Sequence, residues 1–213
     1  MVDPIPYYLD MEFAKANNVS SRHANESAEV HESARIGEST RIWSFTQIRE
    51  DVVIGENTIV GSFVYIDSNV QIGNNCKIQS RSLIYDPAQI HDGVFIGPGA
   101  VLTNDSYPRA VTREGIIKLN TDWIKVGVIV ERGASIGAGA ICVAPVRIGE
   151  WALIGAGAIV IEDVPAFALV VGNPARQIGW VGHDGFPLEE VSKDLFKCPK
   201  TLRMYKFENG RLK

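Results

Sequence analysis

Two places in the sequence combine side chains that could take part in chemistry. His91 lies 40 residues before Glu131, and the repeat described below brings both to one stack. A carboxylate beside an imidazole can orient it as a general base; a surface pair that only supports the fold is the alternative. Farther along, Asn173 and Pro174 predict a fixed turn with free backbone amides, and Arg176 offers a guanidinium suited to a phosphate oxyanion. A purely structural role is the alternative there as well.

The element that must position these residues is a six-residue repeat. Every sixth residue from Ile36 to Leu102 is Ile, Leu or Val, and the residue four places after each, from Thr40 to Ala100, is small or β-branched. Two inward positions per six residues define one short, flat strand. Three such units make a triangular coil of 18 residues, and successive coils stack as parallel strands roughly 4.8 Å apart. The sequence therefore predicts an all-β parallel solenoid.

The repeat divides the chain into four segments. It extends back to Val30, breaks over residues 103–128, and resumes with Val130, Ile136, Cys142, Ile148, Ile154 and Val160, which predicts about six coils. The step from Leu102 to Val130 adds 22 residues to the register, so a long loop must leave one corner of the prism. Long loops in compact domains are usually functional. After residue 164, the segment PAFALVVGNPARQIGW is predicted to leave the solenoid.

The two ends of the chain lack the repeat. We expect an N-terminal extension over residues 1–28 with a short helix at Tyr8–Ala16, a β-helix domain over 29–180, and a short C-terminal tail over 181–213. The segment Leu188–Lys197 predicts a helix, and the tail is expected to cap the prism or to contact a neighbouring subunit.

Composition narrows the function classes. The chain has 213 residues, enough for one sizeable core, and 21 basic against 25 acidic residues give a net charge of −4. This balance gives no electrostatic reason to expect binding to nucleic acid or to an anionic membrane. No apolar run reaches the roughly 20 residues of a membrane span, so a cytoplasmic location is expected. Cys76 and Cys142 fall on inward positions and Cys198 lies in the tail, which predicts buried thiols rather than disulfides.

Three motifs carry a resemblance to a known family. The isoleucine-glycine repeats, the projecting loop and the segment GAGAIVIEDVPAFALVVGNPARQIGW resemble the left-handed β-helix acyltransferases, which take acetyl groups from acetyl-CoA. RIWSFTQI, GVFIGPGAVLTNDSYPRA and VVGNPARQIGWV look most like the nucleotide-sugar 3-N-acetyltransferases, including the UDP-linked amino-glucuronate type. The resemblance covers roughly residues 30–182. Left-handedness is implied by this resemblance alone, because parallel β crossovers are otherwise almost always right-handed.

Stacking arithmetic places a file of small residues on one edge. Trp43, Gly61, Gln79, Gly97, Gly137 and Gly155 form one column, and Ser62, Ser80, Pro98, Ala138 and Ala156 form the next. In the resembling enzymes the pantetheine arm of CoA runs along such a channel between two subunits, which implies a cofactor-binding role for Gly137, Ala138, Gly155 and Ala156. The GNPAR segment, with Asn173, Pro174 and Arg176, then packs against the adenosine end of CoA. Corner residues that only satisfy unusual backbone angles are the alternative.

The reaction centre is expected near the loop. Where other hexapeptide acetyltransferases carry a histidine base, this chain has Asn104 and Asp105, which favours gripping a sugar and its amine; a plain turn is the alternative. The resembling enzymes carry Gln-Asn-Asn where this chain has Gln79-Ser80-Arg81. Either Ser80 replaces the asparagine or the substrate differs.

Five further side chains complete the candidate set. His91 is the possible base, Gln79 and Arg81 are expected to contact the substrate, and a ladder of Arg49, Asp67, Tyr85 and Thr103 on the third corner lies where Arg109 and the loop fold over. We therefore expect catalytic roles for Asn104, Asp105, Ser80 and His91, and substrate contacts from Gln79, Arg81, Tyr85 and Arg109. The ladder has the alternative of only holding the coils in register.

These residues and the resemblance together imply an acetyltransferase. Acetyl-CoA is the expected cosubstrate, a nucleotide-linked 3-amino sugar the acceptor, and surface polysaccharide synthesis the setting, with a homotrimer that forms its sites between subunits and needs no metal. His23, His31 and His183 show no ligand spacing with His91, which disfavours a γ-class carbonic anhydrase with its three-histidine zinc site. A different small acceptor and a non-catalytic scaffold are the remaining alternatives.

Overall fold

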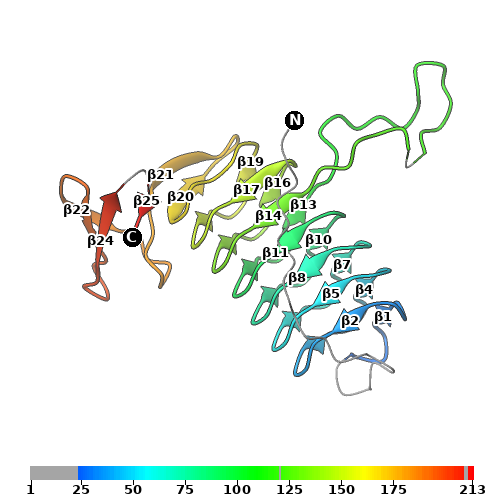
Figure 1. Cartoon of the computed structure of the whole chain (residues 1–213), viewed down its shortest axis with the longest axis horizontal. Coiled ribbons are helices and arrows are strands. Elements are labelled where there is room, and N and C mark those ends of the chain that lie inside the picture. The colour runs from blue at the N-terminus through cyan, green and yellow to red at the C-terminus, as the bar shows by residue number, and fades with distance from the viewer. Residues whose placement is uncertain (1–23, 120, 209–210) are drawn as a thin grey trace.

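The chain forms a parallel β-solenoid that ends in a small antiparallel sheet (Figure 1). The computed structural model describes residues 24–119, 121–208 and 211–213. Along the solenoid each coil contributes one short strand to each of three sheets, and neighbouring strands of a sheet are 18 residues apart in sequence wherever the loop does not intervene, except in the last parallel pair, where Leu153 and Leu169 are 16 apart. In Figure 1 the loop after β13 projects to one side, away from the stack of coils.

Three sheets form the faces of the prism and a fourth forms the tail. The seven-stranded sheet contains β1 (Glu29–Val30), β4 (Gln47–Ile48), β7 (Tyr65–Ile66), β10 (Leu83–Ile84), β13 (Val101–Leu102), β16 (Ile141–Cys142) and β19 (Ile159–Val160). The six-stranded sheet contains β2 (Arg35–Ile36), β5 (Val53–Ile54), β8 (Gln71–Ile72), β11 (Gln89–Ile90), β14 (Val128–Val130) and β17 (Val146–Ile148). The eight-stranded sheet contains β3 (Arg41–Ile42), β6 (Ile59–Val60), β9 (Lys77–Ile78), β12 (Phe95–Ile96), β15 (Ser135–Ile136), β18 (Leu153–Ile154), β20 (Ala168–Val171) and β21 (Arg176–Trp180). The four-stranded sheet contains β22 (Glu189–Ser192), β23 (Leu195–Lys197), β24 (Met204–Glu208) and β25 (Arg211–Leu212).

The core is the stack of inward residues that the repeat predicted. Ile54, Ile72 and Ile90 pair in register across β5, β8 and β11, and each is at most 1% exposed. Polar residues at the small inward positions are satisfied by hydrogen bonds to the next coil: Thr40 Oγ1 donates to the Gly55 carbonyl at 2.7 Å and Thr58 Oγ1 to the Gly73 carbonyl at 3.1 Å. Threonine therefore fits this core because its methyl packs and its hydroxyl finds a backbone partner.

Many corners turn through one residue with positive φ. Asn57, Asn69 and Asn75 take this role with φ of 54–59°, and Gly99, Gly139 and Gly157 take it with φ of 65–69°. Asparagine and glycine suit the left-handed region. Phe63 and Arg81 adopt the same conformation on the same edge as the three glycines, so the turn geometry of this edge is uniform although its side chains are not.

Several predictions about the ends of the solenoid need correction. The prediction of about six coils is too low, because the three sheets hold seven, six and eight strands. The chain does not leave the solenoid directly after residue 164: β20 still pairs in parallel with β18, and only then does β21 return antiparallel. Val128 already belongs to β14, so the loop ends one residue earlier than predicted. The predicted helix at Tyr8–Ala16 lies outside the described residues.

The predicted tail helix at Leu188–Lys197 is wrong. Residues of this segment form β22 and β23, an antiparallel pair that continues through β24 and β25. Its apolar side chains pack with the last coil instead of along a helix face: Phe167 of the solenoid clusters with Cys198, Tyr205 and Leu212 of the tail. The His183 ring lies 4.8 Å from Trp151 and 4.9 Å from Phe167, and burial lowers its pKa. The tail thus packs on the end of its own chain's prism.

All three cysteines are free and buried, as predicted. Burial raises the pKa of the Cys76 thiol to about 11 and that of Cys142 to about 12, so both serve as small apolar core residues. In the part of the chain that the structure describes, no helix is long and apolar enough to cross a membrane.

The core predicts a clear difference between inward and outward isoleucines. Ile72→Ala, at a position 1% exposed, is expected to lower the free energy of unfolding by about 2–5 kcal/mol, because it leaves a cavity between two coils. Ile161→Ala, at a position 48% exposed, is the matched control and is expected to change it by about 0.5 kcal/mol or less. Chemical denaturation measures both; equal losses would contradict the inward assignment.

Candidate functional site

One edge of the prism carries the predicted small-residue file. We call it the groove edge; it comprises residues 43–46, 61–64, 79–82, 97–100, 137–140 and 155–158, between the eight-stranded and seven-stranded sheets. Backbone hydrogen bonds confirm the predicted columns, since Arg81 N donates to Ser62 O, Gly99 N to Ser80 O and Gly139 N to Pro98 O, at 2.9–3.0 Å. Gln79, Ser80 and Arg81 therefore lie on the same edge as Gly137, Ala138, Gly155 and Ala156.

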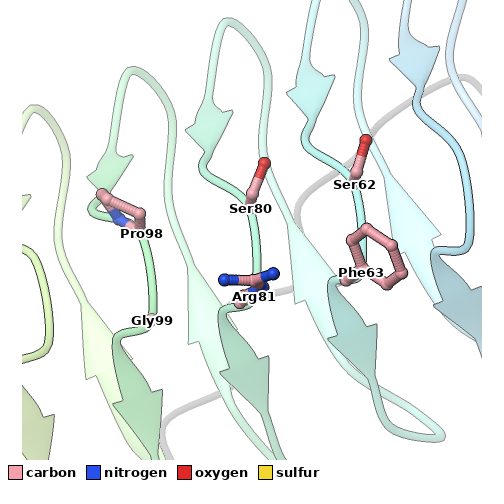
Figure 2. Close-up of a pocket in the computed structure, with 6 residues that line it drawn as sticks. All are labelled: Ser62, Phe63, Ser80, Arg81, Pro98 and Gly99. Atoms are coloured by element: carbon pink, nitrogen blue, oxygen red, sulfur yellow. The ribbon is translucent and has the colours of Figure 1, made fainter.

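A groove of about 460 Å³ opens on this edge. Figure 2 shows its lining, with Ser62, Ser80 and Pro98 in one row and Phe63, Arg81 and Gly99 in the next. The Arg81 guanidinium lies 5.8 Å from the centre of the Phe63 ring, and that ring stacks on Phe45 at 5.1 Å. In the described part of the chain Arg81 makes no ion pair. The groove thus presents a cation held by an aromatic ring and available to an anion.

The glycines of this edge fall into two kinds. A Cβ on Gly137 would lie 2.5 Å from the Ala156 nitrogen, and one on Gly155 would lie 2.7 Å from Val171 Cγ1, so close stacking of coils requires these glycines. Gly139 and Gly157 have positive φ and no heavy atom within 4 Å of a built Cβ. Open space therefore lies beside Gly99, Gly139 and Gly157, and we call this file of positions the open channel. These three glycines were not among the predicted site residues, although each directly follows a residue of the second predicted column, Pro98, Ala138 or Ala156.

The GNPAR segment, residues 172–176, lies at the C-terminal end of the same edge, against the last coil. Ile159 N donates to the Gly172 carbonyl at 2.9 Å, and Ala175 N donates to the Ile159 carbonyl at 2.8 Å. Asn173, Pro174 and Arg176 are exposed. The Ala175 amide, next to the turn expected to have free amides, is therefore engaged by the last coil. The Arg176 guanidinium donates to the neighbouring Ala175 carbonyl at 3.0 Å.

The predicted loop residues lie on a second edge. This loop edge comprises residues 31–34, 49–52, 67–70, 85–88 and the projecting segment 103–127, between the seven-stranded and six-stranded sheets. Asp105 Oδ1 accepts the Tyr107 amide at 2.8 Å, so the turn-forming role left open for Asp105 is realised. The Asn104 carbonyl accepts the Val126 amide at 3.2 Å and closes the base of the loop. Arg109 is exposed, and its guanidinium contacts the Pro108 carbonyl.

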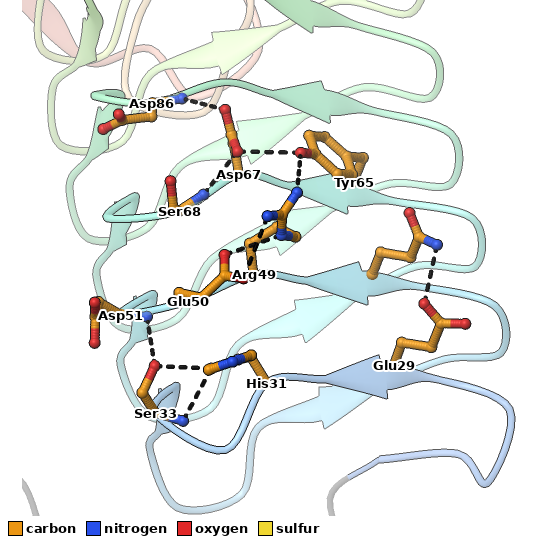
Figure 3. Close-up of polar contacts among 11 residues, drawn as sticks. Glu29, His31, Ser33, Arg49, Glu50, Asp51, Tyr65, Asp67, Ser68 and Asp86 are labelled. Atoms are coloured by element: carbon orange, nitrogen blue, oxygen red, sulfur yellow. Dashed lines mark hydrogen bonds and ion pairs between the residues drawn. The ribbon is translucent and has the colours of Figure 1, made fainter. Parts of the chain in front are cut away.

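A chain of polar contacts runs up the loop edge (Figure 3). Arg49 donates to Tyr65 Oη at 3.3 Å, and Tyr65 donates to Asp67 Oδ1 at 3.0 Å. Desolvation and the bond to Asp67 raise the pKa of Tyr65. The ladder predicted from Arg49, Asp67, Tyr85 and Thr103 is thus bridged by Tyr65, and the Tyr85 ring lies 5.6 Å from that of Tyr65. These contacts connect successive coils.

The third edge carries His91, and here the predicted carboxylate partner is engaged elsewhere. His91 and Glu131 do stack, because His91 N donates to Val130 O and Glu131 N to Ile148 O. However, the Glu131 carboxylate pairs with Arg147 at 2.6 Å and accepts the Glu150 amide at 3.1 Å. The hypothesis of a general base oriented by Glu131 is therefore wrong as stated, and the pair belongs to the coil-supporting ladder.

One chain brings together only part of the predicted set. Gln79, Ser80, Arg81 and the CoA-side residues share the groove edge; Tyr85, Asn104, Asp105 and Arg109 share the loop edge; His91 occupies the third. Among the described residues no cluster of three or more His, Cys, Asp or Glu could hold a metal ion; His23 lies outside them.

Parts of the chain are similar to a known protein family and to curated transferases. Residues 33–68 and 69–104 match the family described as bacterial transferase hexapeptide (six repeats). The dTDP-3-amino-3,6-dideoxy-alpha-D-galactopyranose 3-N-acetyltransferase of Aneurinibacillus thermoaerophilus is 42% identical over 83 residues, 38% of this chain and 42% of that protein. The bifunctional protein GlmU of Thermotoga petrophila is 51% identical over 71 residues, 32% of this chain and 16% of that protein. The chain thus spans less than half the length of these curated relatives.

Solved structures share the fold. A mutant of the N-acyltransferase AntD from Bacillus cereus, in complex with dTDP and coenzyme A, has a TM-score of 0.51 at 21% identity, covering 74% of this chain and 79% of that one. The acetyltransferase domain of PglB from Neisseria gonorrhoeae has a TM-score of 0.50 at 19% identity, covering 73% and 56%. Together with the repeat match, this likeness confirms the predicted left-handed parallel β-helix.

The two kinds of glycine predict losses of stability of different size on substitution. Gly137→Ala is expected to lower the free energy of unfolding by about 1–3 kcal/mol, because its Cβ meets backbone of the next coil. Gly157→Asn is expected to cost about 1 kcal/mol or less, because asparagine tolerates positive φ and the space is open. Thermal and chemical denaturation compare them; the reverse order would contradict the assignment of the open channel.

Proposed function

Since residues 33–104 match the family model for bacterial transferase hexapeptide repeats, we propose that this chain transfers an acetyl group from acetyl-CoA to the 3-amino group of a nucleotide-linked amino sugar. The similarity to the 3-N-acetyltransferase carries the proposal. The groove beside Arg81 supports it, because a nucleotide-linked acceptor brings anionic groups that a free guanidinium can bind. The setting is surface polysaccharide synthesis in the cytoplasm.

The chemistry is acyl transfer by attack of an amine on a thioester. The neutral amine forms a bond to the thioester carbonyl carbon, the C–S bond breaks, and the amine proton leaves to the departing thiolate. Asn104 and Asp105 hold the sugar and its amine, and the Ser80 hydroxyl stands where the resembling enzymes have an asparagine. Alignment of the amine on the carbonyl supplies most of the rate in such a site. With Glu131 paired to Arg147, His91 stays a candidate base only without a carboxylate partner.

Acetyl-CoA is placed along the open channel of the groove edge. An extended pantetheine arm can approach backbone closely where Gly139 and Gly157 leave open space, beside Ala138 and Ala156. Arg176, exposed at the upper end of the edge, is suited to a phosphate of the nucleotide end. On this assignment Gly157→Asn, whose side chain fills the channel, raises KM for acetyl-CoA.

The distribution of site residues over separate edges supports an oligomer. The groove edge and the loop edge of one chain lie on different corners, so a site that uses both is completed by a second copy. A homotrimer satisfies this with one kind of interface. Exposed aromatic side chains are consistent with such packing: Trp43, Phe45 and Phe63 are 52%, 58% and 51% exposed on the groove edge. The division into an extension at 1–28, a β-helix domain at 29–180 and a tail at 181–213 is retained in the proposal.

The reaction is tested by thiol release from acetyl-CoA with a panel of dTDP- and UDP-linked 3-amino sugars. Turnover with at least one acceptor is expected, and Asn104→Ala, Asp105→Ala and Ser80→Ala are each expected to lower kcat/KM by about 10²-fold, as misplacement of the amine does. Arg113→Ala, on the exposed part of the loop, is the control. Thiol release only with a different amine would identify another acceptor, which the Ser80-Arg81 departure favours as the second candidate. Absence of acetyl-CoA binding would contradict enzyme function and leave a scaffold.

The assembly is tested by light scattering after size exclusion. Three chains of 23.3 kDa predict a mass of about 70 kDa. Replacing the exposed aromatic pair with Phe45→Ser and Phe63→Ser is expected to shift the population toward monomer, because these rings provide apolar surface for the contact. A wild-type mass of one chain at assay concentration contradicts the trimer.

A further inference from the structure

The projecting loop is held at its base by an ion pair between a buried carboxylate and a partly exposed lysine. Lys125 Nζ, in the segment that returns from the loop to the solenoid, lies 2.5 Å from Asp86 Oδ2. Asp86 is 4% exposed and is the only charged residue among the buried positions of the part described. A buried carboxylate without a partner is strongly unfavourable, so Asp86 and Lys125 depend on each other.

Further contacts tie this pair to the predicted reaction centre. Val126, next to Lys125, donates its amide to the Asn104 carbonyl at 3.2 Å, and Asn104 precedes Asp105. Gly127 approaches Pro87 so closely that a Cβ would lie 2.8 Å from the Pro87 carbonyl oxygen. The segment 125–127 therefore lies directly against residues 86–87. Displacement of Lys125 would move Val126, whose amide binds the Asn104 carbonyl.

Asp86 is itself held by the preceding coil, which contains Asp67. Its amide donates to Asp67 Oδ2 at 3.4 Å, and Asp67 is held by Tyr65, which contacts Arg49 (Figure 3). The loop is thus linked through Asp86 to three earlier coils rather than to a single turn. Apolar side chains farther out in the loop are exposed: Ile116, Ile117 and Ile124 are 65%, 71% and 84% exposed.

We propose that the Lys125–Asp86 ion pair positions the base of the projecting loop, and with it Asn104 and Asp105, for the acceptor. Lys125 and Asp86 are positioning residues, since they act through the loop and touch no reacting atom. The catalytic consequence rests on the proposed function, whereas the ordering of the loop rests on the contacts alone.

The test compares Lys125→Met with Lys118→Met, a lysine of the same loop with no ion pair among the described residues. Lys125→Met is expected to speed amide exchange at residues 104–107 and 126 by about tenfold or more. It is expected to lower kcat/KM for the acceptor by about 10²-fold while KM for acetyl-CoA stays unchanged. Lys125→Arg is expected to recover much of both, because it keeps the charge. Lys118→Met is expected to behave as the wild type.

Three outcomes overturn the proposal. Unchanged amide exchange at residues 104–107 in Lys125→Met would show that the ion pair does not order the loop. Faster amide exchange with unchanged kcat/KM for the acceptor would show that the ion pair does not position the catalytic residues. A double variant, Asp86→Asn with Lys125→Met, leaves no unpaired buried charge; recovery of wild-type exchange in it also contradicts an anchor. If the wild type turns over no acceptor, the proposed function fails, yet the exchange comparison still decides whether the ion pair orders the loop.

Discussion

The structure depends on one constraint, the vertical register of 18 residues between hydrogen-bonded coils. Backbone amides of one coil donate to carbonyls of the next all along the solenoid, as from Gly55 to Ile72 and from Gly73 to Ile90. Since every residue sits above its counterpart one coil earlier, a column has a single environment along the whole prism. Inward columns must be apolar or self-satisfied, and glycine is required at those corner positions, such as Gly137, where a Cβ would meet the next backbone at close range.

This constraint explains what the sequence could predict. The core, the loop position and the three edges follow from counting by six and eighteen, and the backbone hydrogen bonds of Arg81, Gly99 and Gly139 agree with that count. The count gives the height and edge of a residue but not the direction of its side chain. Glu131 therefore stacks on His91 as predicted while its carboxylate turns to Arg147, and Gly137 proves to be required by packing while Gly157 lines open space.

Where the repeat ends, prediction from local pattern fails. The segment Leu188–Lys197 was expected to form a helix, yet it contributes β22 and β23, and Phe196 packs against the apolar cluster around Phe167 at the end of the solenoid. Tertiary contacts outweigh local propensity in such short segments. Likewise, the ion pair between Lys125 and Asp86 joins residues 39 apart and follows from no period in the sequence.

The division of the predicted site residues between edges is the feature that most shapes the functional account. Arg81 and Asp105 belong to different corners of one prism, so a site that uses both requires two copies. The most direct test co-expresses an Arg81→Ala chain and an Asp105→Ala chain with different tags and isolates the mixed trimers. Each mixed trimer contains one junction with both edges intact, so recovery of about one third of wild-type turnover is expected. Turnover no higher than that of the separate variants would contradict a site shared between subunits.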